Sequence, residues 1–240
     1  MSEIAIIGND EEIEEEDKVQ FRLLYEGRLE SSGNKRRMGP KKHAIRQVLH
    51  FQLKRLWHTN KSLQMLALNQ EIPSRKWHEL RTQIFGSKYN EPGITDDQRF
   101  EIALHYMAHN WERLGCNFLP LITGRIALRC RLNILLLRPN EGKYIFERGD
   151  IDGQLKTLID ALKMPETNED IGRTEEVIEA EYNPFYCLLA DDKLITDVHV
   201  TTDELLLLPH EREMNAVDAF AVIDVQINHV DSLMHIRHFD

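Results

Sequence analysis

Apolar and polar residues alternate in three stretches of the chain, residues 19–25, 126–136 and 219–227. A period of two places every second side chain on one face, so each stretch predicts a β-strand with one buried face. Residues 185–189 form a short, continuous apolar run, and a strand-like segment that ends at Val200 follows it. Several strands are therefore expected in the fold.

Four other segments carry apolar residues at helical spacing: 45–57, 77–84, 100–114 and 155–162. The third follows TDDQ, a capping box that begins at Thr95, and Gly115 is its predicted stop signal. The fourth ends before Pro165, because the residue before a proline is disfavoured in a helix. The pattern thus predicts a chain of mixed helices and strands.

The composition indicates in which cellular compartment the protein is expected. The chain has 240 residues, of which 42% are hydrophobic, as in ordinary globular proteins. Its apolar runs, such as residues 205–208, are too short to span a bilayer, and the N-terminus has no secretion signal. Three cysteines without CxxC spacing argue against a disulfide framework or a zinc knuckle. We expect a cytoplasmic protein.

The formal net charge of −10 is unevenly distributed. Residues 1–17 contain eight acids and no Lys or Arg, so they predict a disordered acidic tail. The segment KRRMGPKKH, read as a loop after the first strand, concentrates positive charge. Because DNA backbone binding uses such charge, its five basic residues are predicted to contact phosphates: Lys35, Arg36, Arg37, Lys41 and Lys42.

Aspartates gather around the fourth predicted helix, in the stretch ERGDIDGQLKTLIDALKMP. Asp150 and Asp152 precede it, Lys156 lies on its first turn, and the pair Asp191 and Asp192 ends a later apolar run. Carboxylates that converge repel one another unless a cation neutralises them, and Mg²⁺ prefers such oxygen ligands. The order of elements therefore indicates a Mg²⁺ site for phosphate chemistry, with Mn²⁺ as a substitute.

The same residues have a second interpretation, which stays open on sequence alone. The two first aspartates can cap a helix N-terminus, and Lys156 can form a surface pair with Asp152 or Asp160. An EF-hand loop is excluded, because Leu155 and Ala161 occupy the positions that need Gly and Glu. A phosphatase of the haloacid-dehalogenase type stays a minor alternative, because residues 147–149 interrupt the strand that should precede its motif.

His105 and His109 have the spacing of a helical zinc pair, i and i+4. Both are expected on the face opposite Phe100 and Met107, and no HExxH glutamate accompanies them. A solvent-exposed helix face is therefore predicted in preference to a zinc site.

The strings DIDGQLKTLIDAL and ADDKLITDVHV resemble the core of the RusA-type Holliday junction resolvase family. The match covers about 35 residues. It implies an α/β (α+β) fold with a mixed sheet and flanking helices, and a Mg²⁺-dependent endonuclease that cleaves branched DNA in recombination and repair. Carried over by position, it implies a metal site of Asp150, Asp152 and Asp192, with Lys156 as the catalytic lysine. It also implies a homodimer, because resolving a junction needs two symmetric nicks.

This chain departs from the family pattern in two ways. Gly153 stands where the family usually has Asn, and the chain is about twice as long as compact members. We expect a single domain over residues 18–240, with a helical insertion near 59–118 and a charged loop insertion near 166–184. The alternative is a RusA-like DNA-binding or regulatory protein that has lost cleavage.

Overall fold

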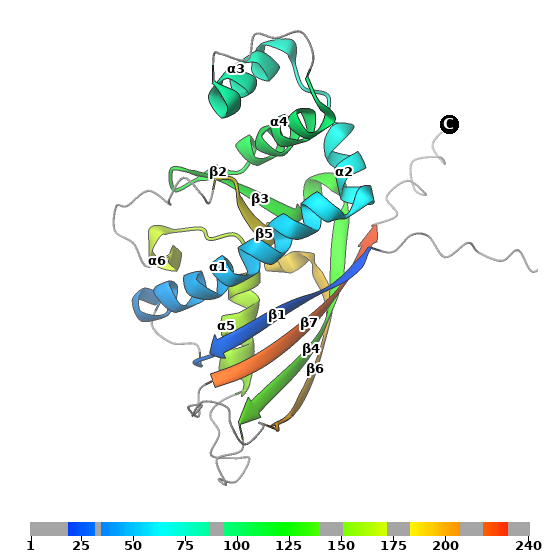
Figure 1. The fold of residues 1–240 in the computed structure, drawn as a ribbon. Helices are drawn as coiled ribbons and strands as arrows, with labels where there is room; N and C mark the ends of the chain where they lie inside the picture. The colour runs from blue at the N-terminus through cyan, green and yellow to red at the C-terminus, as the bar shows by residue number, and fades with distance from the viewer. Residues whose placement is uncertain are drawn as a thin grey trace, which may run out of the picture.

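A four-stranded mixed sheet is the centre of the fold in the computed structural model (Figure 1). The structure describes residues 19–31, 35–86, 94–139, 151–171, 183–206 and 218–229. In spatial order the strands are β1 (Gln20–Arg28), β7 (Asp218–His229), β4 (Leu128–Pro139) and β6 (Ile195–Leu205). β7 is antiparallel to β1 and β4, whereas β4 and β6 are parallel. The predicted mixed α and β fold is confirmed.

Two strands of a second, smaller sheet, β3 (Cys116–Ile122) and β5 (Phe185–Leu189), directly precede the strands β4 and β6 of the first sheet. The second sheet also contains β2 (Glu112–Arg113), and β3 is parallel to β5. β3 leads into β4 through the 3-10 turn η1 (Gly124–Ile126), and β5 leads into β6 through η4 (Asp192–Leu194). The alternation pattern missed β3 because most of its residues are buried on both faces, so apolar and polar positions do not alternate along it.

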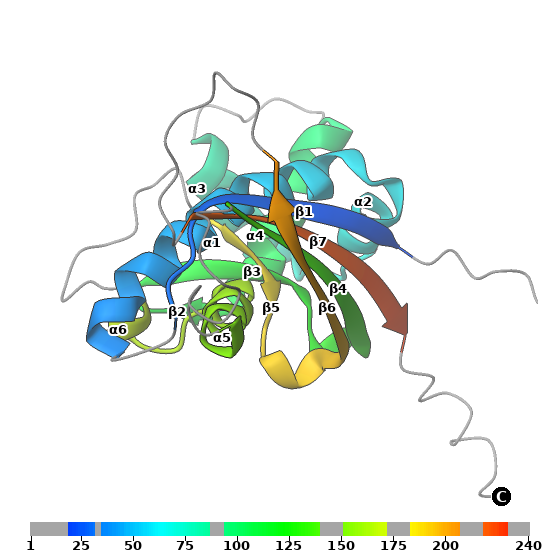
Figure 2. The same ribbon diagram turned by 90° about the horizontal axis from the view of Figure 1, so that it is seen from below.

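The longest helix, α1 (Lys35–Thr59), packs against the sheet with α5 (Ile151–Leu162). Figures 1 and 2 show both helices on the same side of the four-stranded sheet. Their buried residues, such as Leu49 and Leu158, join one core with Ile223 of β7 and Ile134 of β4. The fourth helix of the sequence pattern is therefore confirmed as α5.

The predicted helical insertion contains α2 (Lys61–Leu68), α3 (Ser74–Phe85) and α4 (Asp96–His109). The capping box is confirmed: the Thr95 side chain accepts from the Gln98 N–H, and the Gln98 side chain accepts from the Thr95 N–H. The charged segment after α5 includes the short helix α6 (Asn168–Ile171). Within the described ranges, no helix is long and apolar enough to cross a membrane.

The predicted basic loop is wrong in its conformation, because this segment forms the first turns of α1. Gly39 and Pro40 are unfavourable inside a helix, yet the helix runs through both. Met38, which is fully buried, anchors this part of the helix. Burial and tertiary contacts thus override the local signals of Gly and Pro.

β6 lies at the edge of the four-stranded sheet, with β4 on one side. In the part of the chain that the structure describes, no strand pairs with its other side. Most of its residues are exposed, including Asp197 and Asp203. The strand therefore presents an accessible backbone edge.

Candidate functional site

The parallel strands β4 and β6 are joined by a crossover that contains α5. Lys163, the residue after α5, forms a bridge with Leu189 at the end of β5, close to where β6 begins. The start of α5 therefore lies toward the other end of these strands, where β4 and β6 finish (Figure 1). In open α/β sheets, ligand sites form outside the carboxyl ends of parallel strands, so the start of α5 has a favourable position.

Asp152 and Lys156 occupy the exposed face of α5, one turn apart. The opposite face of the helix, which includes Gly153 and Leu158, is buried. Asp150 lies outside the residues that the structure describes. The structure thus places two of the four predicted catalytic residues side by side on one accessible face.

Arg138 adds a positive charge at the same edge of the sheet. It is the last residue but one of β4 and continues the inward-facing row of Ile134 and Leu136. Its side chain is only 4% exposed. This residue was not predicted from the sequence, although a cation at the next position of an apolar row was a detectable signal.

Asp192 lies at the other end of α5. Its carboxylate is 3.6 Å from the Nζ atom of Lys163. Burial acts to lower the pKa of Lys163, but the carboxylates of Asp192 and Glu166 outweigh it and raise the pKa. Asp192 therefore belongs to an ion pair at the amino end of β6.

Asp191 has a local role in the same turn. Its side chain accepts a hydrogen bond from the Lys193 N–H at 2.9 Å and so caps η4. This hydrogen bond is the main reason that the pKa of Asp191 lies below its usual value. The aspartate pair is thus engaged in shaping the turn between β5 and β6.

The predicted convergence of Asp152 and Asp192 on one ion is not found in this arrangement. Along α5, the rise of 1.5 Å per residue separates Asp152 from Lys163, the partner of Asp192, by about 16 Å. Ligands of one Mg²⁺ ion lie about 2 Å from it, so the two carboxylates cannot share an ion here. No group of three or more His, Cys, Asp or Glu residues suited to a metal occurs within the described ranges.

The cause of this separation is the course of β5. Because β5 runs parallel to β3, it ends beside the carboxyl end of α5, where the Met164 N–H donates to the Leu189 carbonyl at 2.8 Å. The aspartate pair follows this end directly. A pattern of strand, loop, helix and strand does not reveal which end of the helix the last strand reaches.

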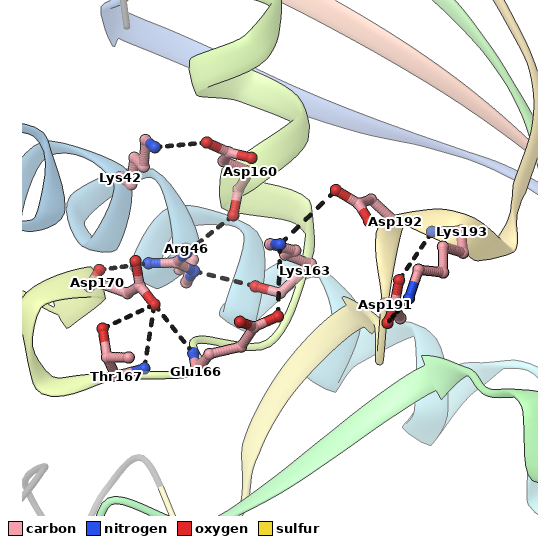
Figure 3. Close-up of polar contacts among 10 residues, drawn as sticks. All are labelled: Lys42, Arg46, Asp160, Lys163, Glu166, Thr167, Asp170, Asp191, Asp192 and Lys193. Carbon is pink, nitrogen blue, oxygen red and sulfur yellow. Dashed lines mark hydrogen bonds and ion pairs between the residues drawn. The ribbon is translucent and has the colours of Figure 1, made fainter. Parts of the chain in front are cut away.

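A buried arginine holds α5 to its neighbours (Figure 3). Arg46 of α1 is 3% exposed and donates to the carbonyl oxygens of Asp160 at 2.8 Å, Lys163 at 3.0 Å and Asp170 at 2.8 Å. Its guanidinium thus provides hydrogen-bond donors to carbonyl groups at the carboxyl end of α5 and in α6. This network fixes the structure around the crossover and was not apparent from the sequence.

Asp170 completes the network from the side of α6. Its carboxylate accepts hydrogen bonds from the Glu166 N–H and from the N–H and hydroxyl of Thr167. Partial burial acts to raise the pKa of Asp170, and these hydrogen bonds outweigh it, so the pKa is lowered. Its charge has a structural role.

The basic segment at the start of α1 is partly neutralised. Lys41 forms an ion pair with Glu30, and Arg37 lies 3.8 Å from the same carboxylate. Lys42 pairs with Asp160 of α5, where its side chain is 12% exposed. The Lys41 hydrogen bond is the main cause that lowers the pKa of Glu30. Of these three cations, Arg37 is the most accessible, with 72% of its side chain exposed.

Lys35 and Arg36 belong to the first turn of α1, but their side chains are outside the described part of the structure. Among the described side chains of the predicted phosphate-binding set, Arg37 is largely exposed, whereas Lys41 and Lys42 pair closely with acids.

The two histidines of α4 differ in their surroundings. His105 is partly buried, and burial is the main cause that lowers its pKa. His109 is exposed at the end of the helix. The predicted solvent-exposed face is therefore correct for His109 and wrong for His105.

No family model, curated protein or solved structure shows a significant match to this chain. The proposed function consequently depends on the geometry of the chain and on the resemblance in its sequence.

Proposed function

We propose that this chain is a RusA-like endonuclease that cleaves branched DNA such as four-way junctions. The observation that carries the proposal is the exposed pair Asp152 and Lys156 at the start of α5, toward the carboxyl edge of the parallel strands β4 and β6. This is the edge at which open α/β sheets bind their ligands. The sequence of the pair matches the spacing of the family motif.

Each residue of this face has a distinct proposed role. Lys156 is a mobile point charge that binds the phosphate to be cleaved. Asp150 and Asp152 either accept a proton from the attacking water or bind a metal ion. Asp192 is left out, because it pairs with Lys163 at the far end of α5.

Mg²⁺ commonly binds one or two protein carboxylates together with the phosphates of the substrate. We therefore propose Asp150 and Asp152 as its ligands, with Mn²⁺ as a substitute. When bound, such an ion supplies positive charge to the phosphate and lowers the pKa of water. A homodimer remains part of the proposal, since two nicks are needed to resolve a junction.

A second candidate is a RusA-like protein that binds DNA or regulates a partner without cleaving. The position of Asp192 favours it, because Asp192 pairs with Lys163 after the end of α5, whereas Asp152 lies in the first turn of the helix. In this case the exposed face of α5 would contact phosphates without breaking them.

The test is a cleavage and binding assay with the full chain on junction, fork, flap and linear duplex DNA, with and without Mg²⁺. Metal-dependent nicks in the junction with little cutting of linear duplex support the resolvase-like function. Junction binding without nicks in Mg²⁺ or Mn²⁺ supports the second candidate. If the protein neither binds nor cleaves any of these substrates, both candidate functions are rejected. Hydrolysis of a small phosphate monoester favours the phosphatase alternative.

A further inference from the structure

The helical insertion contains a cavity of about 360 Å³ between α2, the start of α3 and α4. Pockets for small molecules commonly range from about 300 to 1,000 Å³, so this one suits a single ring system. It lies outside the face of α5 discussed above and outside the segments that match the resolvase family. Its lining combines apolar, aromatic and oppositely charged side chains, among them Ile72, Trp77, Asp96, Arg99 and Ala103.

The charged side chains of the cavity are not satisfied by one another. Asp96 and Arg99 are three residues apart on α4 and so share one face of the helix. Within the described part of the chain, neither side chain forms an ion pair or a hydrogen bond. Both side chains are exposed at the wall of the cavity, so both are accessible to a ligand. An accessible guanidinium at the wall of a cavity suits a ligand with hydrogen-bond acceptors.

The apolar part of the wall favours a flat ligand. Trp77 of α3 is partly buried and contributes a large aromatic surface to the cavity, and Ile72 and Ala103 add aliphatic contacts. Unpaired nucleobases stack on aromatic side chains and also form hydrogen bonds along their edges. A nucleobase therefore matches both the apolar and the polar features of this cavity.

We propose that this cavity binds an unpaired guanine base. Guanine presents two acceptors, O6 and N7, that suit Arg99, and the adjacent N1–H and amino group suit the Asp96 carboxylate. Adenine places an acceptor where guanine has N1–H, so it would face the carboxylate with the wrong polarity. Trp77 provides the stacking surface. The proposal goes beyond nuclease activity and does not depend on it.

The guanine can belong to a free nucleotide or to an unpaired position in a DNA strand. The test compares GMP, AMP and IMP, which lacks the amino group of guanine, by calorimetry with the full chain. Two short single-stranded oligonucleotides, identical except for a central G or A, are titrated in parallel. We expect GMP or the G-containing strand to bind about tenfold or more tighter than its adenine counterpart, with IMP weaker than GMP.

Variants make the assignment specific to the cavity. Asp96→Asn should abolish the preference for guanine over adenine, and Arg99→Gln and Trp77→Leu should weaken the binding of both bases. Asp97→Asn is the matched control, because it lies in the same first turn but does not line the cavity. Arg75→Gln, on exposed α3 surface, controls for the loss of a positive charge.

Thermal unfolding of each variant shows whether it is folded before its binding is compared. Tighter binding of the oligonucleotide identifies the ligand as a nucleotide within a strand, and tighter binding of GMP identifies it as a free nucleotide. Equal binding of guanine and adenine probes, no binding of any probe, or an equal effect of Asp96→Asn and Asp97→Asn would each overturn the proposal.

Discussion

The Nζ atom of Lys163 lies 3.6 Å from the carboxylate of Asp192. This contact places Asp192 at the carboxyl end of α5, whereas Asp152 lies in its first turn. The sequence motif assigns the two aspartates to one site. In the structure they lie toward opposite ends of the paired strands β4 and β6. Their separation gives a direct way to test which residues belong to the proposed active site.

Asp152→Asn and Asp192→Asn should have unequal effects on cleavage. Asp152→Asn removes a carboxylate from the proposed reactive face, so junction cleavage should fall about 100-fold or more. Asp192→Asn loses an ion pair whose aspartate is 44% exposed, a change of about 1 kcal/mol or less, so cleavage should stay within about fivefold of wild type. Single-turnover rates on a junction substrate measure both effects. An equal loss in both variants would mean that the active protein brings the two carboxylates together.

The basic segment should divide into a DNA-binding part and a structural part. The triple change of Lys35, Arg36 and Arg37 to Ala should weaken junction binding and reduce its salt dependence, by about 0.9 in the log–log slope for each phosphate that the variant no longer neutralises. Lys42→Ala should leave that slope unchanged. Because Lys42 pairs with Asp160 in a partly buried position, its loss should instead lower the free energy of unfolding by about 1 kcal/mol or more. Fluorescence anisotropy at several salt concentrations and urea unfolding measure the two outcomes.

Arg46→Met should destabilise the protein more than most surface changes. Three main-chain carbonyl groups lose their donor, and methionine supplies none, so we expect a loss on the order of 3 kcal/mol or more. Arg46→Lys is the matched control, because lysine keeps the charge but lacks the forked geometry, and it should lie between wild type and Arg46→Met. Urea unfolding is the measurement. Equal stability of all three proteins would show that the network contributes little.

His50 should make stability depend on pH. Burial is the main cause that lowers its pKa from 6.5 to about 4, so the unfolded chain binds the proton more strongly than the folded chain. The contribution of His50 to stability is present above pH 6.5 and is lost as the pH falls toward about 4. Between pH 7 and pH 5 this amounts to about 2 kcal/mol.

His50→Asn tests this dependence, since asparagine retains an acceptor for the Tyr186 N–H, which lies 3.0 Å from Nδ1. Urea unfolding at both pH values should show a smaller loss for the variant than for wild type. The partly buried His105 contributes in the same direction in both proteins, so the difference between them isolates His50. If both proteins lose the same stability between pH 7 and pH 5, His50 is not the source of the pH dependence.

Local signals predicted much of the fold. The alternation over residues 126–136 identified β4, and the TDDQ capping box identified the start of α4, because in both cases neighbouring residues determine the outcome. The first turns of α1 were missed, since Gly39 and Pro40 are unfavourable locally and only burial of Met38 compensates for them. The sequence therefore predicted elements better than their ends.

The site was predicted less completely than the fold. Asp152 was predicted to precede the helix, but it lies in the first turn of α5, where its spacing of four residues from Lys156 places both on one exposed face. The position of Asp192 depends on the parallel pairing of β3 and β5, which joins segments more than sixty residues apart in sequence. No local pattern reveals such a pairing.

The exposed edge of β6 has a consequence for self-association. An antiparallel pairing of two copies centred on Val200, the middle of the strand, would set Asp197 of each copy opposite Asp203 of the other. Like charges directly opposite across a strand pair are destabilising, and proteins use charged edge residues to prevent uncontrolled sheet growth. The acids of β6 thus disfavour this edge-to-edge pairing of two copies.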